Sequence, residues 1–200
     1  NGRHSALELL FSDPAITDSL YRCNPSLQIL NLSAARAIYA LGQQQAQGLN
    51  ILEVGAGTAA TTREVLSLAS STIRHYQFTD VSRLFLHEAR ELLSEYPQVS
   101  YGLFDINQPI DEALKMDGGY QVILAVNVLH DAIDLTKCLQ GLRALLADDG
   151  YLILIEATDQ HSPMQLATVG FIEGINAFND FRQSSGSGML TQPAWLALLA

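Results

Sequence analysis

Asn50-Ile-Leu-Glu-Val-Gly-Ala-Gly-Thr-Ala-Ala-Thr-Thr62 is the stretch of this sequence that decides the fold. Its first five residues are apolar apart from Asn50 and Glu53, which predicts a short buried strand that ends at Gly55. Gly55 and Gly57 have no Cβ atom, so the chain can turn tightly there and bring its backbone close to a ligand. The residues that follow predict a helix. A strand, a glycine turn and a helix in this order are typical of a nucleotide-binding site in an α/β sheet.

Glu53 and the residues after the glycines indicate which nucleotide the turn binds. The dinucleotide motif G-x-G-x-x-G would need glycine at position 60, where this chain has Ala60. An acidic side chain is unfavourable beside a pyrophosphate but suits a ligand that carries an ammonium and a sulfonium. The pattern Glu53-x-Gly55-x-Gly57 closely resembles the glycine-rich motif of class I S-adenosylmethionine (SAM) methyltransferases.

Ala59 stands where that family usually has a third glycine. If this position needs a positive φ, alanine costs about 1 kcal/mol or more; if it is already helical, alanine is harmless or better than glycine. We expect the second case, because residues 58–62 look like the start of a helix with Thr58 or Thr61 as its cap.

Composition predicts one soluble globular domain. The chain has 200 residues, of which 48% are hydrophobic and 16% charged, values typical of a folded domain. A net charge of −10, with no Lys/Arg cluster among 11 basic residues, disfavours a nucleic-acid partner. Cys23 and Cys138 match no metal or disulfide spacing, so we expect no metal and a cytoplasmic location. No apolar run has the length of a membrane span. The first residue, Asn1, and the apolar C-terminal end indicate a fragment of a longer polypeptide.

Hydrophobic patterns divide the chain into three parts of one compact domain. Residues 1–46 predict a helical lid, 47–159 a SAM-binding core and 160–200 a helical C-terminal segment. In the core, strands and helices alternate, which predicts a Rossmann-like α/β fold whose parallel sheet is covered on both faces. The expected strand order is the 3-2-1-4-5 of class I methyltransferases, whose sixth and seventh strands this sequence does not supply. The strands are expected at residues 50–54, 76–79, 99–104, 122–126 and 151–155.

Every predicted strand ends in or near a polar residue. The carboxyl ends of parallel strands form the ligand-binding edge of such a sheet, so we expect these side chains to surround one site. They are Glu53, Asp80, Asp105, Asn127 with His130, and Glu156. Asp80 follows the second strand, where a carboxylate accepts hydrogen bonds from ribose hydroxyls; the alternative role is a helix cap.

The resemblance to class I methyltransferases implies further contacts with the cofactor. Asp105 resembles the acid that binds the exocyclic amine of adenine, with Ile106 against the ring; the alternative is an ordinary turn aspartate. Asn127 lies where the family lines the methionine side. The complete predicted cofactor site is Glu53, Gly55, Ala56, Gly57, Asp80, Val81, Asp105, Ile106 and Asn127.

His130 and Glu156 are the predicted catalytic pair, because their strands should be adjacent and both side chains can then face one cleft. A carboxylate fixes the tautomer of an imidazole and raises its basicity, so that it works as a general base near neutral pH. Methyl transfer to carbon requires removal of a proton from carbon, and the pair therefore favours a carbon acceptor. The alternative is a helix-capping or core histidine.

Four segments make the resemblance more specific. They are Glu53-Val-Gly-Ala-Gly57, Phe78-Thr-Asp-Val-Ser82, Asn127-Val-Leu-His130 and Leu154-Ile-Glu156-Ala-Thr158. Together they resemble the C-methyltransferase domains embedded in polyketide synthases and hybrid peptide/polyketide synthetases. The resemblance implies SAM-dependent methylation of the α-carbon of a β-ketoacyl chain, held by phosphopantetheine on an acyl carrier protein beside neighbouring synthase domains. It also implies that His130 removes the α-hydrogen and that Tyr21, in the lid, is a candidate for positioning the substrate carbonyl.

Other activities are compatible with the same core. An O- or N-methyltransferase would differ only in its acceptor, and an epimerase of the same ancestry would use a base at the same carbon without methyl transfer. A decayed domain would keep the fold without activity, and a free-standing small-molecule methyltransferase is the remaining alternative. The His130 and Glu156 pair is the feature that favours carbon methylation.

Overall fold

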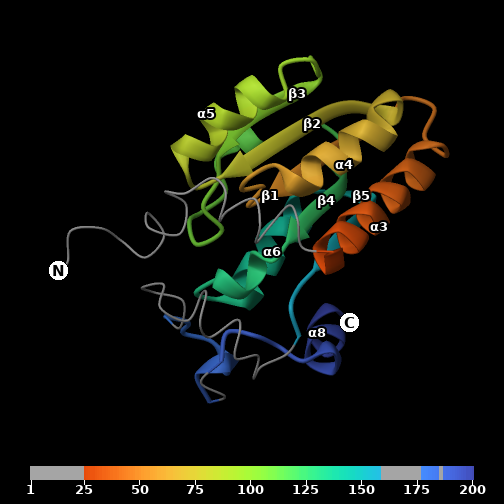
Figure 1. Cartoon of the computed structure of the whole chain (residues 1–200). Helices are drawn as coiled ribbons and strands as arrows, with labels where there is room; N and C mark the ends of the chain where they lie inside the picture. Colours follow the sequence, from red (N-terminus) through yellow and green to blue (C-terminus); the bar gives the residue numbers. More distant parts are fainter. Residues whose placement is uncertain (1–24, 159–176, 185–186) are drawn as a thin grey trace.

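A five-stranded parallel sheet forms the centre of the molecule, in the order β3-β2-β1-β4-β5 (Figure 1). The structure is a computed structural model that describes residues 25–158, 177–184 and 187–200. The predicted strand order and direction are confirmed. The strands are β1 (Leu49–Val54), β2 (Ile73–Asp80), β3 (Val99–Leu103), β4 (Tyr120–Val126) and β5 (Leu146–Ile155). The α-helices are α3 (Pro25–Gly42), α4 (Ala60–Ala69), α5 (Arg83–Leu92), α6 (Leu135–Leu145) and α8 (Gln192–Leu199). Short 3-10 turns are η2 (Ser70–Thr72), η3 (Glu112–Leu114), η4 (Leu129–Asp131) and η5 (Phe181–Ser184).

β1 lies at the centre of the sheet and is buried along its whole length. It pairs with β2 on one side and with β4 on the other. Ile51 and Leu52, neighbours in the chain, point to opposite faces and belong to two separate hydrophobic clusters. A strand with apolar side chains on both faces requires helices on both sides of the sheet.

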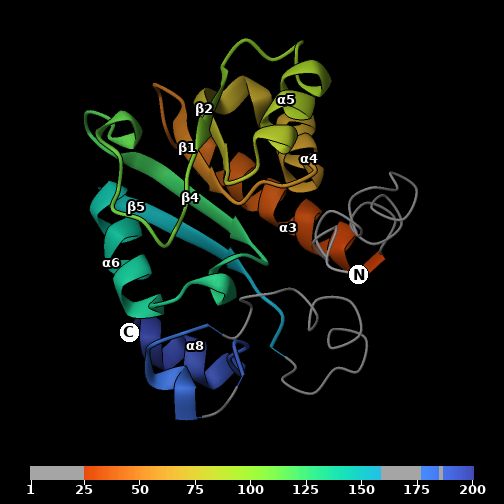
Figure 2. The ribbon, with the colours of Figure 1, turned by 90° about the vertical axis from the view of Figure 1, so that its left-hand side faces the viewer.

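Helices cover the two faces as the sequence predicts (Figure 2). α3, α4 and α5 pack on the face that presents Ile51, Tyr76 and Val122. α6 and α8 pack on the other face, which presents Leu52 and Ile123. The helices pack on the faces of the sheet, and the predicted polar residues lie at its edge, where the carboxyl ends of the strands meet.

Some element boundaries differ from those predicted. β2 starts at Ile73, before the expected residue 76. β5 starts at Leu146. Tyr120 on β4 pairs with Leu146 on β5, but Val122, two residues later, pairs with Tyr151, so the register of the two strands shifts between these pairs. The Asp149-Gly150 pair is typical of a turn, but here it lies at an irregularity inside a strand. Apolar residues at helical spacing predict one helix or two over residues 164–181, but residues 177–180 are not helical. The helices expected before residue 25 lie outside the described residues.

The prediction that Ala59 is helical is wrong. Ala59 has φ 61° and ψ 24°, in the left-handed region, and α4 begins after it without a side-chain cap. Neither Thr58 nor Thr61 is therefore the cap. A left-handed conformation costs an L-residue about 1–2 kcal/mol. Ala59 is only 1% exposed, so its methyl group is buried, and burying one such group contributes about 0.8 kcal/mol. The buried methyl thus offsets much of the strain.

We predict that Ala59→Gly changes the free energy of unfolding by less than about 0.5 kcal/mol, because relief of strain, a lost methyl contact and a more flexible unfolded chain nearly cancel. Ala60→Gly, one residue later at the first position of α4, is the matched control and should cost up to about 1 kcal/mol, the value for a helix interior. Urea unfolding measures both. A helical Ala59 would instead make Ala59→Gly at least as destabilising as Ala60→Gly.

Candidate active site

The glycine turn after β1 bends through Gly55 (φ 61°) and Gly57 (φ 52°). A Cβ at Gly55 would lie 2.4 Å from Cγ2 of Val128, whereas a Cβ at Gly57 would meet nothing within 4 Å. The expected tight turn is present, but Gly55 allows the close approach of Val128 rather than of a ligand. Gly57 is the glycine with open space beside it. The amide of Ala56 donates to the carbonyl of Thr79 (2.9 Å), which ties the turn to β2.

Glu53 is a buried carboxyl group at the carboxyl end of β1, only 2% exposed. Its Oε2 accepts hydrogen bonds from the hydroxyls of Thr62 on α4 (2.5 Å) and Tyr76 on β2 (2.6 Å). Burial, with a smaller contribution from the charge of Asp80, outweighs both hydrogen bonds and raises the pKa of Glu53 to about 7. The site therefore holds an acid that ionises near neutral pH and gains from a cation beside it.

We predict that Glu53→Gln removes a pH dependence of stability. The Glu53 pKa is raised from 4.5 to about 7 on folding. The folded state therefore binds the Glu53 proton more tightly than the unfolded state does. The stability that this proton contributes is complete below pH 4.5 and is lost as the pH rises through about 7, so the free energy of unfolding falls by about 3 kcal/mol. Glutamine cannot ionise and still accepts from Thr62 and Tyr76. Urea unfolding of both proteins without SAM at about pH 5 and about pH 8 measures the difference.

Glu64→Gln is the matched control, because it makes the same change at a carboxylate of α4 that is exposed to solvent. The stability of Glu53→Gln relative to the wild type should rise between the two pH values. An equal difference at both values would contradict the assignment of a raised pKa to Glu53.

Asp80 ends β2 and faces the glycine turn. Its Oδ2 accepts from the amide of Gly57 (2.9 Å) and its Oδ1 from the amide of Ser82 (2.8 Å). The alternative role, a helix cap, belongs to Ser82, whose hydroxyl accepts from the amide of Phe85. Burial raises the pKa of Asp80, against the hydrogen bonds from the backbone. Each carboxylate oxygen can accept a second hydrogen bond, as the predicted ribose contact requires.

Asp105 and Asn127 each have a structural role besides the predicted one. Asp105 Oδ1 accepts from the amide of Asn107 (2.9 Å), which makes it a turn aspartate that also lines the cavity described below. Asn127 has φ 50°, a conformation that asparagine tolerates better than most residues. Its Oδ1 accepts from the amide of Ala157 (3.1 Å), so it joins the ends of β4 and β5.

His130 and Glu156 are in direct contact. His130 lies in η4, directly after β4, and Glu156 follows β5, the neighbouring strand. His130 Nδ1 is 2.7 Å from Glu156 Oε2, and their side chains are 9% and 2% exposed. Because a carboxylate can only accept, Nδ1 carries the hydrogen, and in the neutral ring Nε2 keeps its lone pair. The geometry is that of a general base oriented by a carboxylate.

Glu156 also fixes the turn that carries the histidine. Its Oε1 accepts from the amides of Val128 (3.0 Å) and Leu129 (2.7 Å). One buried carboxylate thus holds both the backbone of η4 and the imidazole ring.

Asp131 lies at the site but was not predicted from the sequence. Its Oδ1 lies 3.4 Å from His130 Nε2, and its side chain is 51% exposed. Burial lowers the pKa of His130, but the hydrogen bond and charge of Glu156, together with the charge of Asp131, outweigh burial and raise it. Its position beside His130 in the sequence was the only available signal.

One cavity of about 360 Å³ joins the glycine turn to the histidine. The predicted site residues that line it are Glu53, Gly55, Ala56, Gly57, Asp80, Val81, Asp105, Ile106, Asn127 and His130. Glu156 is not among its lining residues and reaches it through His130. Tyr21 lies outside the described residues. Three residues that were not predicted as site residues also line the cavity: Asn31, Thr61 and Phe85. Thr61 donates to Asn31 Oδ1 (2.9 Å) and so joins α4 to α3.

Neither a metal cluster nor a membrane-spanning helix occurs within residues 25–158, 177–184 and 187–200. No group of three His, Cys, Asp or Glu side chains there could hold a metal ion. Every helix in these ranges is too short or too polar to cross a bilayer.

Comparisons with known proteins connect this geometry to a family. The family described as "Methyltransferase domain" matches residues 52–152. The highly reducing polyketide synthase valA of Aspergillus terreus is 34% identical over 99% of this chain and 8% of its own length. Pyochelin synthetase PchF of Pseudomonas aeruginosa is 32% identical over 91% of this chain and 10% of its own. The chain thus spans about a tenth of these relatives.

Solved structures also resemble nearly the whole chain, and two serve as examples. The CurJ carbon methyltransferase is 30% identical, with a TM-score of 0.90 over 99% of this chain and 54% of its own. The CMeT domain of the citrinin polyketide synthase is 27% identical, with a TM-score of 0.88 over 100% of this chain and 53% of its own. This chain therefore spans about half of each solved neighbour.

Proposed function

This chain belongs to the family of methyltransferase domains, and we propose from that premise that it methylates the α-carbon of a β-ketoacyl thioester with SAM. Its fold is the class I methyltransferase fold predicted from the sequence. The proposal is supported by solved neighbours named carbon methyltransferases and by relatives named polyketide synthases. The single observation that carries it is the 2.7 Å contact between His130 and Glu156 at the cavity.

The residues around the cavity fit SAM. Gly57 leaves open space beside the turn, Glu53 gains from a cationic neighbour, and Asp80 has capacity for hydroxyl donors. Phe104 and Ile106 offer apolar surface in the same cavity, as an adenine ring requires. When bound, SAM supplies an electrophilic methyl group on a sulfonium. The contacts of Glu53, Asp80, Asp105 and Asn127 with this group are proposals.

His130 removes the α-proton in this proposal. The α-hydrogen of a β-ketoacyl thioester lies between two carbonyl groups, which makes it acidic enough for an imidazole. Nε2 takes the proton while Nδ1–H stays bonded to Glu156, so the ring becomes a cation beside Glu156 and Asp131. Both carboxylates stabilise that cation.

The proposed partner is an acyl carrier protein that presents the substrate on phosphopantetheine, with neighbouring synthase domains. The relatives support this proposal, because they are named as a synthase and a synthetase and are far longer than this chain. Tyr21 remains a proposed substrate-positioning residue. The division into a lid (1–46), a core (47–159) and a C-terminal segment (160–200) is likewise a proposal.

A direct assay tests the reaction. Full-length protein mixed with SAM and a β-ketoacyl carrier protein should yield an acyl group heavier by one methyl, detected by mass spectrometry of the released acid. An unchanged acyl group, with SAM binding intact, would count against carbon methylation and in favour of an O- or N-acceptor or an epimerase.

We predict that Asp80→Ala weakens SAM binding by about 10- to 100-fold, because hydrogen bonds to a charged group are worth about 1.5–3 kcal/mol. Titration calorimetry measures the affinity. Asp111→Ala is the matched control, since Asp111 accepts from the amide of Ala113 just as Asp80 accepts from Ser82, but lies outside the cavity. Unaltered affinity in Asp80→Ala would exclude the ribose role.

A further inference from the structure

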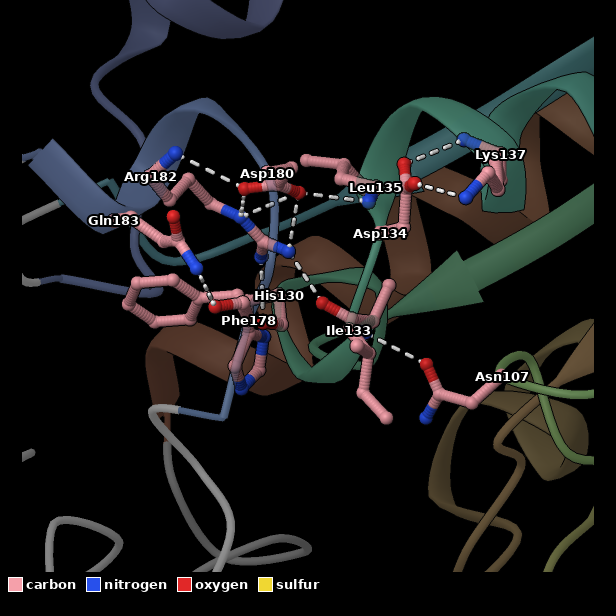
Figure 3. Close-up of polar contacts among 11 residues, drawn as sticks. Asn107, His130, Ile133, Asp134, Leu135, Lys137, Phe178, Asp180, Arg182 and Gln183 are labelled. Atoms are coloured by element: carbon pink, nitrogen blue, oxygen red, sulfur yellow. Dashed lines mark hydrogen bonds and ion pairs between the residues drawn. The ribbon is translucent and has the colours of Figure 1, made fainter.

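A segment of the C-terminal part, residues 178–183, lies against the loop 130–135 that carries His130 (Figure 3). The amide of Asn179 donates to the carbonyl of Ile133 (2.8 Å), which joins the two backbones directly. From the other side, Asn107 Oδ1 accepts from the amide of Ile133 (2.6 Å). The segment is far from the loop in sequence, yet it makes a dense set of contacts with the loop beside the proposed base.

Arg182 is the centre of these contacts and is 1% exposed. Its Nη1 donates to the carbonyl of His130 (2.9 Å) and its Nη2 to the carbonyl of Ala132. Its guanidinium lies over the ring of Phe178, 5.0 Å from the centroid. An arginine buried this completely is retained only when its charge and its donors are satisfied.

Asp180 supplies the matching negative charge. Its carboxylate accepts from Arg182 Nε (2.9 Å) and Nη2 (2.7 Å). Oδ2 also accepts from the amide of Leu135 (2.8 Å), the first residue of α6. The carboxyl is buried, which raises its pKa, but the hydrogen bonds and charge of Arg182 with the amide of Leu135 lower it to about 2. Asp180 therefore ties the arginine to the start of α6.

The turn that carries His130 is thus held at both ends. Glu156 accepts from the amides of Val128 and Leu129 at its start. Arg182 donates to the carbonyls of His130 and Ala132 at its end. An anion holds the amides and a cation holds the carbonyls, so the backbone of His130 has little freedom to rotate.

We propose that Arg182, oriented by Asp180, is a positioning residue that fixes His130 for proton removal and couples the C-terminal segment to the reacting centre. This inference rests on the proposed role of His130 as the base. Arg182 acts through the backbone of His130, and its planar fork is what allows one side chain to hold two carbonyls and a carboxylate together.

Arg182 also acts on His130 through its charge. Among the described residues, the charged groups around the imidazole are Glu156 after β5, Asp131 in the same turn, and Arg182 with its partner Asp180. Arg182 lowers the pKa of His130, whereas Glu156 and Asp131 raise it. Removal of the arginine charge should therefore raise the pKa of His130, and the rate should then reach its plateau at a higher pH, because the base must be neutral.

Two variants of the full-length protein separate fork from charge. Arg182→Met loses both, and Arg182→Lys keeps the charge without the fork. Both should lower kcat by about 10- to 100-fold, because a small misplacement of a catalytic group has an effect of this size. SAM affinity, from calorimetry, should stay within about threefold. The pH midpoint of kcat should rise in Arg182→Met and stay at the wild-type value in Arg182→Lys.

Arg90→Met is the matched control, because Arg90 also lies over an aromatic ring, 5.1 Å from the centroid of Tyr101, but on α5. It should keep wild-type kcat and pH midpoint. Wild-type kcat in Arg182→Lys would overturn the proposal even if Arg182→Met does not fold. A shared loss of kcat and SAM affinity would also overturn it, since that indicates general destabilisation. An inactive wild type contradicts the proposed function instead, and the two failures are therefore distinct.

Discussion

His130→Ala is expected to lower the rate of methyl transfer by about 10²- to 10⁴-fold, the contribution typical of a general base. The variant leaves no group in place of Nε2 to accept the α-proton, and water lacks the fixed position and the basicity of the imidazole. SAM affinity should change by less than about threefold, because the proposed cofactor contacts come from Glu53, Asp80, Asp105 and Asn127 and not from His130. Single-turnover kinetics and titration calorimetry measure the two quantities.

His87→Ala is the matched control for that experiment, since His87 lies on α5 with 70% of its side chain exposed. It should behave as the wild type. A fully active His130→Ala protein would show that no proton is taken by this residue. The assignment of the base would then be wrong, and an oxygen or nitrogen acceptor, which needs no proton removed from carbon, would be favoured.

Glu156→Gln is expected to reduce kcat by about 10²- to 10⁴-fold, and by no more than His130→Ala, although the side chain keeps its size. The analogy is with catalytic triads, where a carboxylate-to-amide change costs about 10⁴. Glu156 accepts from two amides and from His130 Nδ1. In glutamine only one of the two terminal atoms accepts. If that oxygen stays with the amides, the NH₂ group faces Nδ1, and the ring hydrogen moves to Nε2, where the base must be bare.

The pH dependence of the rate is a second, independent test of the role of Glu156. Burial lowers the pKa of His130, and Glu156 is the main group that raises it above its ordinary value. The wild-type rate should rise with pH through that raised pKa, because only the neutral ring accepts a proton. In Glu156→Gln the residual activity should appear at lower pH. Glu156→Gln with wild-type kcat and profile would contradict the orienting role.

Much of the fold follows from features that a single sequence displays. Apolar runs separated by helices predict the parallel sheet, whereas its strand order follows from the resemblance to class I methyltransferases. The polar residues at the strand ends identify the ligand edge, because parallel strands all end there. Asp80, His130 and Glu156 were therefore predictable, although residue type and position alone do not establish their roles. The contact between His130 and Glu156 follows from adjacency of β4 and β5.

Other features depend on tertiary contacts that leave no local pattern. The left-handed φ of Ala59 is decided by the geometry of the turn and offset by burial of its methyl group, whereas its sequence neighbours favour a helix. Gly55 is required by Val128, a residue distant in sequence. Arg182 looks like an ordinary surface residue in the sequence, and only the packing of residues 178–183 against loop 130–135 makes it buried.

The position of the transferred methyl group tests the central proposal most directly. Full-length protein is incubated with a β-ketoacyl carrier protein and SAM labelled with carbon-13 in its methyl group, and the released acyl product is analysed by NMR. We predict a single labelled methyl bonded to the α-carbon, and no such product from His130→Ala. A label on oxygen or nitrogen would contradict carbon methylation by the His130 and Glu156 pair.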